Sequence, residues 1–154
     1  MPDLAAMVDD VLRRHGLDAP LLTLEITETA IMEDVVKGIA VLNHLKSLGL
    51  MLAIDDFGTG YSSMAYLQQL PIDVLKIDAS FIRRMGSRPV DTSIVRAIVG
   101  LATAMDVRCL AEGVETEDQR RFLSGLGCAF GQGYLWGRPM PPTEAAAWAA
   151  GLGT

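Results

Sequence analysis

The chain has 154 residues, of which 50% are hydrophobic, and its 19 aspartates and glutamates outnumber 13 lysines and arginines, giving a net charge of −6. This length and hydrophobicity exclude a disordered tail and predict one globular domain with a substantial core. The negative charge, with basic residues scattered along the chain, argues against binding to a nucleic-acid polymer. No apolar run approaches the roughly 18 residues that span a membrane, and no secretory signal opens the sequence, so we expect a cytoplasmic protein without a membrane anchor.

The first half of the sequence alternates helical and extended patterns. A helical pattern over Met1–Gly16 precedes a short apolar strand at Leu21–Thr27. A second helix is expected over Glu33–Leu48, ending at Gly49. The apolar run Leu50–Asp56 predicts the next strand.

The second half of the sequence continues this alternation and ends in an Ala-rich helix capped by Thr143. Helices and strands are expected in turn at Tyr61–Leu70, Asp73–Asp78, Ser93–Met105, Val107–Glu112, Thr116–Gly127 and Ala129–Trp136. Strands that alternate with helices through short connections are parallel and joined by right-handed crossovers. The sequence therefore predicts an α/β fold in one domain over residues 1–154, with about five parallel strands.

Polar side chains gather where the predicted strands end. They are Glu25, Glu28, Asp55, Asp56, Lys76, Asp78, Glu112, Glu115 and Gln132. The carboxyl ends of parallel strands meet at one edge of a sheet, where β/α enzymes place their catalytic residues. Glu25 and Lys76 alternate with apolar neighbours and would point into the interior of a barrel. Any single acid could instead be solvated or cap the next helix. The recurrence of polar residues at the ends of successive strands, however, makes coincidence a poor explanation.

The donor types in this row predict a hard divalent cation. Carboxylate oxygens suit Mg²⁺ or Mn²⁺, whereas Zn²⁺ prefers cysteine and histidine. His15 and His44 lie in helical segments, and Cys109 and Cys128 lie in apolar segments, where we expect two reduced core thiols. Lys76 would balance the charge or orient a water beside the cation. Two cations held by carboxylates commonly serve the hydrolysis of phosphodiesters.

Two other metal-dependent chemistries share some of these features. The segment DDFGTG contains the Asp-Phe-Gly triplet of protein kinases, but no His-Arg-Asp segment or glycine-rich phosphate loop accompanies it, which excludes a kinase. Strand-end Asp, Glu and Lys residues would also suit proton abstraction in an enolase-like barrel. That alternative gives the segments DDFGTG and AEGVET no role.

Five segments together carry a family resemblance. LEITE, DDFGTGYSS, LKIDASFI, LAEGVET and GQGYLWGRPMP follow one another as in the EAL domain family, which the sequence resembles over nearly its whole length. Members of this family are cyclic di-GMP phosphodiesterases of bacterial signalling. The resemblance implies a partial TIM-like (β/α) barrel that uses Mg²⁺ or Mn²⁺ to hydrolyse cyclic di-GMP to the linear dinucleotide pGpG.

The resemblance also implies a role for each matching residue. Metal ligands or their immediate neighbours would be Glu25, Asp55, Asp56 and Glu112. Lys76 and Glu112 would lie near the attacking water, and Glu28 would hold the DDFGTG loop in place. The residues around the substrate would be Thr27, Glu115 and Gln132.

The sequence departs from the family pattern in one respect. The Glu-Ala-Leu triplet and the strand with the metal-binding asparagine are absent, and a complete barrel of this type takes about 250 residues. We therefore expect a barrel without its N-terminal part, with little or no hydrolysis by the chain alone. A homodimer, or association with the missing half, would cover the open strand edges. The alternative function is a noncatalytic module that binds cyclic di-GMP or a protein partner.

Overall fold

The computed structural model describes residues 4–58, 64–86 and 89–151. Its elements are α1 (Leu4–His15), the 3-10 helix η1 (Ala19–Leu21), β1 (Thr23–Thr27), α2 (Glu28–Met32), α3 (Val35–Ser47), β2 (Met51–Phe57), α4 (Met64–Leu67), β3 (Val74–Ile77), α5 (Ala79–Arg84), α6 (Pro89–Ala104), β4 (Arg108–Glu112), α7 (Glu117–Leu126), β5 (Phe130–Gln132) and α8 (Pro142–Gly151). Within these ranges, no helix has the length and apolar character needed to cross a bilayer.

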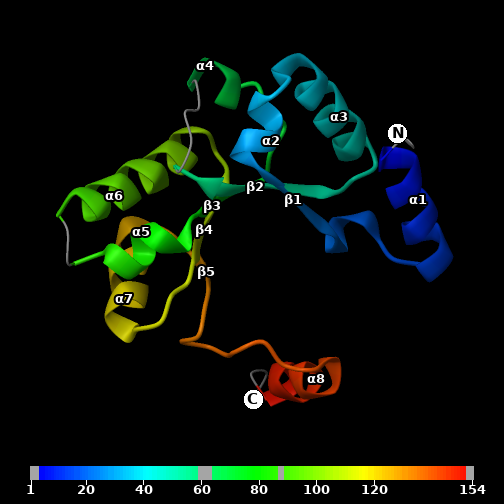
Figure 1. Ribbon diagram of the computed structural model, residues 1–154. Coiled ribbons are helices and arrows are strands. Elements are labelled where there is room, and N and C mark those ends of the chain that lie inside the picture. The colour runs from blue at the N-terminus through cyan, green and yellow to red at the C-terminus, as the bar shows by residue number, and fades with distance from the viewer. Residues whose placement is uncertain (1–3, 59–63, 87–88, 152–154) are drawn as a thin grey trace.

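The strands form one sheet in the order β1-β2-β3-β4-β5, and every neighbouring pair is parallel. The α/β fold with five parallel strands, predicted from the alternating pattern, is confirmed. Figure 1 shows the strands side by side at the centre of the molecule and α8 set apart beyond β5. The register places Thr27 opposite Asp55 and Glu112 opposite Gln132, so the polar strand ends lie along one edge of the sheet.

Two short helices, α2 and α5, were not predicted. Each follows directly on a strand and begins at a side-chain cap. Thr27 accepts a hydrogen bond from the N–H of Ala30 at 3.4 Å, and Asp78 accepts one from the N–H of Ser80 at 2.9 Å. Helices of five and six residues contain too little of the 3.6-residue repeat to be recognised in the sequence.

Other element boundaries also differ from the prediction. Strand β1 begins at Thr23, because Leu21 belongs to the 3-10 helix η1, and α3 begins at Val35. Helix α6 begins earlier than expected, at Pro89, where a proline suits the first helical turn. Strand β5 ends at Gln132 because the chain turns within the GYLWG segment. The helix expected over Tyr61–Leu70 is described only from residue 64, where α4 begins, and residues 59–63 of the DDFGTGYSS segment lie outside the described residues.

The core lies between the sheet and the helices along its outer face. Leu52 and Ile54 of β2 and Leu75 and Ile77 of β3 alternate along their strands toward this face, and all are buried. The intervening residues of the strands point to the opposite face, where Lys76 and others line a hollow of about 220 Å³. The strand alternation therefore separates the apolar core from the candidate site.

Asp73 fastens the amino ends of three strands to one another. Its carboxylate accepts hydrogen bonds from the Lys46 ammonium at 2.5 Å and from the N–H of Leu52 at 2.8 Å. Its backbone N–H donates to the carbonyl of Leu52, and its carbonyl accepts from the N–H of Arg108, both at 2.9 Å. These bonds fix the strand ends opposite the candidate site, because they join β2, β3 and β4 at one level.

Replacing Leu52 by alanine should lower the free energy of unfolding by about 2–5 kcal/mol, because the lost side chain leaves a cavity in the core. Leu52 is 0% exposed, whereas Leu21 is 78% exposed. Leu21→Ala is therefore the matched control and should change the free energy by no more than about 0.5 kcal/mol. Urea unfolding followed by circular dichroism measures both variants. Equal losses in the two variants would contradict this description of the core.

Candidate functional site

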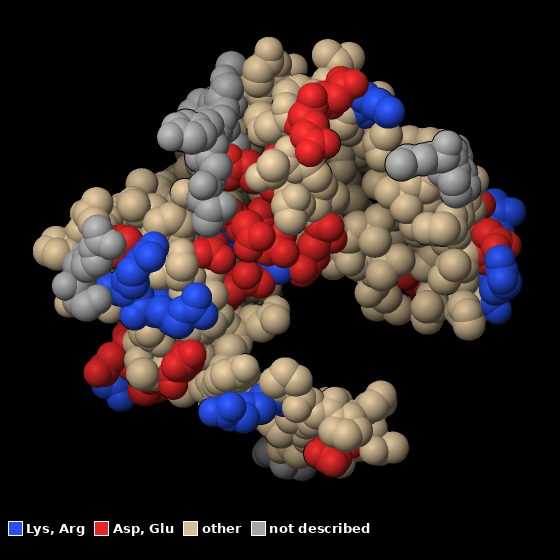
Figure 2. All heavy atoms as spheres, in the orientation of Figure 1, with Lys and Arg blue, Asp and Glu red and all other residues tan. Residues whose placement is uncertain are grey.

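The candidate site lies at the carboxyl edge of the sheet, where acidic side chains from neighbouring strands converge. Glu25 belongs to β1, Asp55 and Asp56 to β2, and Glu112 to β4, with Lys76 of β3 among them. Figure 2 shows acidic side chains gathered at the centre of the molecule, over the strand ends. The parallel strands bring these residues together although they lie far apart in the sequence.

Lys76 is the centre of this group. Its side chain is only 3% exposed, and its Nζ lies 2.6 Å from Glu25, 3.0 Å from Asp55 and 2.7 Å from Glu112. Burial alone would lower the pKa of Lys76, but the hydrogen bonds to Glu112, Glu25 and Asp55 outweigh it and raise the pKa above the ordinary lysine value. The ammonium is therefore charged at neutral pH and holds carboxylates from three strands at one point.

A bulge in β2 brings two consecutive aspartates to the same edge. Ile54 pairs with Leu75 and Phe57 pairs with Ile77, so β2 uses one residue more than β3 over this stretch. Asp56 takes up the irregularity with a φ of +54°, a left-handed conformation that is uncommon for residues other than glycine. A regular strand would point neighbouring side chains to opposite faces. The bulge thus explains how adjacent aspartates can serve one site.

Asp55, Asp56 and Glu112 form a candidate cation site, because each offers a carboxylate oxygen and these oxygens lie within 4.8 Å of one another. Reduced hydration raises the pKa of Asp56, as do the negative charges of Asp55 and Asp78. Burial raises the pKa of Glu112, and the charges of Asp55 and Glu25 add to this, although contact with Lys76 opposes it. The crowded carboxylates therefore carry more negative charge than one ammonium offsets, and such an oxygen donor set fits Mg²⁺ or Mn²⁺.

Glu28 joins the start of α2 to the loop that follows the aspartates. It is buried, and its Oε2 accepts a hydrogen bond from the N–H of Gly58 at 3.2 Å. Gly58 has a φ of +95°, and a Cβ there would lie 3.2 Å from the side chains of Ile98 and Phe81, so glycine suits this turn. Among the described residues, Oε1 of Glu28 has no hydrogen-bond partner. The contact joins Glu28 to the first glycine of the DDFGTG segment.

The three residues assigned to the substrate lie around the same edge in different settings. Thr27 caps α2 opposite Asp55. Gln132 is exposed and lies opposite Glu112. Glu115 is an exposed residue of the loop after β4, and no contact in the described residues joins its carboxylate to the acidic cluster. The structure thus places Thr27 and Gln132 beside the cluster and Glu115 in the loop that follows Glu112.

Gln119 is a supporting residue that the sequence analysis missed. Its Oε1 accepts hydrogen bonds from the N–H groups of Glu115 and Thr116, at 2.8 and 3.0 Å, and its Nε2 donates to the carbonyl of Ile82 at 3.1 Å. These bonds clamp the loop after Glu112 to the end of α5. The signal was available, because a threonine cap followed three residues later by glutamine is a capping box.

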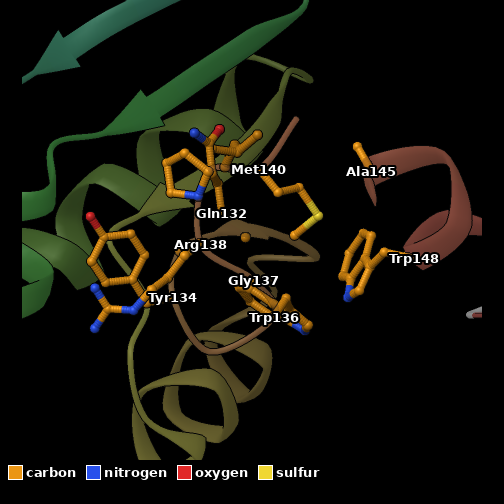
Figure 3. A pocket seen from close by; sticks show the side chains of 12 residues that line it. Gln132, Tyr134, Trp136, Gly137, Arg138, Met140, Ala145 and Trp148 are labelled. Carbon is orange, nitrogen blue, oxygen red and sulfur yellow. The ribbon is translucent and has the colours of Figure 1, made fainter. Parts of the chain in front are cut away.

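An aromatic hollow of about 750 Å³ lies beside Gln132, between β5 and α8. Figure 3 shows Met140 and Trp148 facing one another across it, with Trp136 below. The Arg138 guanidinium lies 4.4 Å from the ring centroid of Tyr134. The side chains of Trp136, Trp148 and Tyr134 are all exposed in this structure. The density of aromatic residues in GYLWGRPMP was the sequence signal for this surface.

A parallel sheet with carboxylates and a lysine at its carboxyl edge is the arrangement of part of a β/α barrel with a candidate metal site. The chain belongs to the EAL domain family, whose sequence profile matches residues 1–139. The bifunctional diguanylate cyclase/cyclic di-GMP phosphodiesterase MucR of Pseudomonas aeruginosa is 46% identical over 143 residues, which cover 91% of this chain and 21% of that protein. The cyclic di-GMP phosphodiesterase NbdA of the same organism is 46% identical over 140 residues, covering 89% of this chain and 18% of that protein.

Solved structures of other proteins share the fold of this chain. The MucR phosphodiesterase in complex with cyclic di-GMP matches with a TM-score of 0.91 at 44% identity, covering 94% of this chain and 58% of that chain. Klebsiella pneumoniae BlrP1 in complex with manganese and cyclic di-GMP matches with a TM-score of 0.82 at 33% identity, covering 90% and 35%. The chain spans about a fifth of the length of the curated relatives above.

Replacing Lys76 by methionine should lower the free energy of unfolding by about 2–4 kcal/mol, because it leaves three carboxylates without the ammonium group that they share. The pKa of Lys76 is raised on folding, so its stabilisation is fully present below the ordinary lysine pKa and is lost only as the pH rises through the folded value. Urea unfolding at pH 7 without divalent cations therefore measures the full effect.

Lys37→Met is the matched control for this variant, because Lys37 is exposed on α3. It should leave stability within about 0.5 kcal/mol of the wild type. A Lys76→Met chain as stable as the Lys37→Met chain would show that the lysine does not hold the carboxylates together.

Proposed function

We propose that residues 1–154 form part of a divalent-metal-dependent phosphodiesterase domain that hydrolyses cyclic di-GMP to pGpG in bacterial second-messenger signalling. The observation that supports this most strongly is the cluster of Asp55, Asp56 and Glu112, whose carboxylate oxygens lie within 4.8 Å of one another, with Lys76 bound to two of its members. The solved relatives MucR and BlrP1, with cyclic di-GMP in their complexes, support the choice of substrate. The proposed second-messenger substrate supports a cytoplasmic location for the chain.

In this proposal the carboxylates hold Mg²⁺ or Mn²⁺, and the manganese complex of BlrP1 supports that choice. The ligands or their immediate neighbours are Glu25, Asp55, Asp56 and Glu112. When bound, a divalent cation supplies positive charge that polarises a phosphodiester and makes water easier to deprotonate. Lys76 keeps three of the carboxylates in place and, together with Glu112, orients the attacking water.

The remaining residues shape the space around the substrate. Glu28 positions the DDFGTG loop through its bond to Gly58. Thr27 and Gln132 border the cluster from β1 and β5, and Glu115 contacts the substrate from the loop that Gln119 clamps. A cyclic dinucleotide offers two phosphates and two bases, so contacts on several strands would fix one phosphodiester beside the cation.

We further propose that the site is completed by chain segments beyond this sheet. Among the described strands, β1 and β5 are each paired on one side only, and the chain covers 58% of the MucR structure. The N-terminal half of the barrel, or a second copy of the chain, would cover these edges and supply further ligands. The chain alone would then hydrolyse cyclic di-GMP weakly or not at all.

A noncatalytic module is the second candidate function, favoured by the same unpaired strand edges. In that case the chain binds cyclic di-GMP, or a protein partner, without turnover. Binding and turnover are therefore measured separately.

Cyclic di-GMP should bind to the chain in the presence of Mn²⁺, and Glu112→Gln should weaken that binding at least about tenfold, because it removes a carboxylate from the cation site. Isothermal titration calorimetry measures the affinity, and chromatography of the products measures hydrolysis to pGpG. Light scattering on the same sample gives the oligomeric state. Turnover that Glu112→Gln abolishes, in this chain or in a longer chain that includes the N-terminal half of the barrel, would favour the enzyme. Binding without turnover in both chains would favour the noncatalytic module.

Glu33→Gln is the control, because Glu33 is exposed at the end of α2, outside the carboxylate cluster. This variant should bind cyclic di-GMP as the wild type does. A folded chain that binds no cyclic di-GMP with Mn²⁺, or binds it equally well as Glu112→Gln, would refute the proposed function.

A further inference from the structure

Two buried thiols lie together between β4 and the segment that leads into β5. Cys109 and Cys128 are 7% and 3% exposed, and both are free. Leu110 of β4 pairs with Phe130 of β5. Cys109 is one residue before Leu110, and Cys128 is two residues before Phe130. The Sγ of Cys128 lies 3.4 Å from the carbonyl oxygen of Cys109. The same sulfur lies 3.4 Å from the carbonyl oxygen of Phe130.

The two thiols differ in their surroundings. Cys128 borders a hollow of about 180 Å³ that Arg120, Ser124 and Trp136 also line, whereas Cys109 does not. A space of this size admits a molecule as small as hydrogen peroxide. The neighbouring Cys109 thiol lowers the pKa of Cys128 and burial opposes this, whereas the Cys128 thiol and burial both raise the pKa of Cys109. Cys128 thus borders a space that peroxide can enter and is the first of the two thiols to lose its proton.

We infer that Cys109 and Cys128 form a peroxide-oxidisable dithiol whose disulfide fastens the edge strand β5 to β4. The Cys128 thiolate attacks one oxygen of hydrogen peroxide, the O–O bond breaks, and the leaving hydroxide takes up a proton to form water. The Cys109 sulfur then attacks the sulfenic sulfur of Cys128, the S–O bond breaks, and a second water leaves with the proton of Cys109. Two thiols and one peroxide give one disulfide and two waters.

The disulfide would be a covalent crosslink on the side of the sheet that holds Gln132. Among the described strands, β5 is paired only with β4 and has three residues, so few backbone contacts hold it. A bond between residues 109 and 128 closes a loop around α7 and restricts the unfolded chain. The oxidised protein should therefore be the more stable form. This inference depends on the two thiols and not on the proposed phosphodiesterase function.

Peptide mapping of the peroxide-treated folded chain tests the inference directly. Trypsin, which does not cleave before proline, should separate the thiols into the peptides 109–120 and 122–154. Oxidation should link these two peptides and lower the intact mass by about 2 Da, the mass of two hydrogens. The melting temperature should rise by about 5–10 °C and return to its original value with a thiol reductant.

Cys109→Ala and Cys128→Ala identify the sulfur that reacts first. Dimedone, a sulfenic acid reagent, should label Cys128 in the peroxide-treated Cys109→Ala chain and should leave the Cys128→Ala chain unlabelled. Neither variant should gain thermal stability with peroxide. Sulfinic or sulfonic acid without linked peptides in the wild type, disulfides only between chains, or thiols that remain unoxidised would each overturn the inference. The peptide map of the wild type decides the question even if a variant fails to fold.

Discussion

The contact of one buried ammonium with carboxylates from three strands is the interaction on which the candidate site depends. Lys76 would be costly to bury alone, because burial disfavours its charge. Glu25, Asp55 and Glu112 reverse this, since each places an oxygen within 3.0 Å of Nζ. The same contact limits repulsion among the acids themselves. Lysine and carboxylates thus stabilise one another, and a divalent cation would neutralise the remaining negative charge.

A strand bulge and several side-chain hydrogen bonds to the backbone fix the residues around this contact. The bulge at Asp56 turns two consecutive aspartates to one edge, and Glu28 holds the loop that follows them through Gly58. On the neighbouring side, Gln119 ties the loop after Glu112 to α5. At the opposite edge, Asp73 fastens the amino ends of the strands. A site built from side chains on separate strands keeps its geometry only if the strands are fixed at both their carboxyl and their amino ends.

The sequence predicted the sheet well because alternation and helical periodicity are local signals. The strands through Glu25, Lys76 and Glu112 and the threonine cap of α7 follow from such patterns, as does the meeting of their polar ends at one edge. The bulge at Asp56 could not be predicted, because it is defined by the register of β2 against a strand that comes later in the sequence. The exposure of Trp148 likewise depends on where α8 lies, which no local pattern specifies.

The most direct measurement of the central claim is a magnesium titration of the chain, followed by carbon-13 NMR of the side-chain carboxyl groups. Mg²⁺ is diamagnetic, so each carboxyl signal can be followed as the ion is added. If Lys76 gathers the carboxylates into a cation site, the signals of Asp55, Asp56 and Glu112 should shift together with one apparent affinity. Exposed acids such as Glu144 should remain unchanged. Shifts spread evenly over surface acids, with no common affinity for the three, would contradict the account.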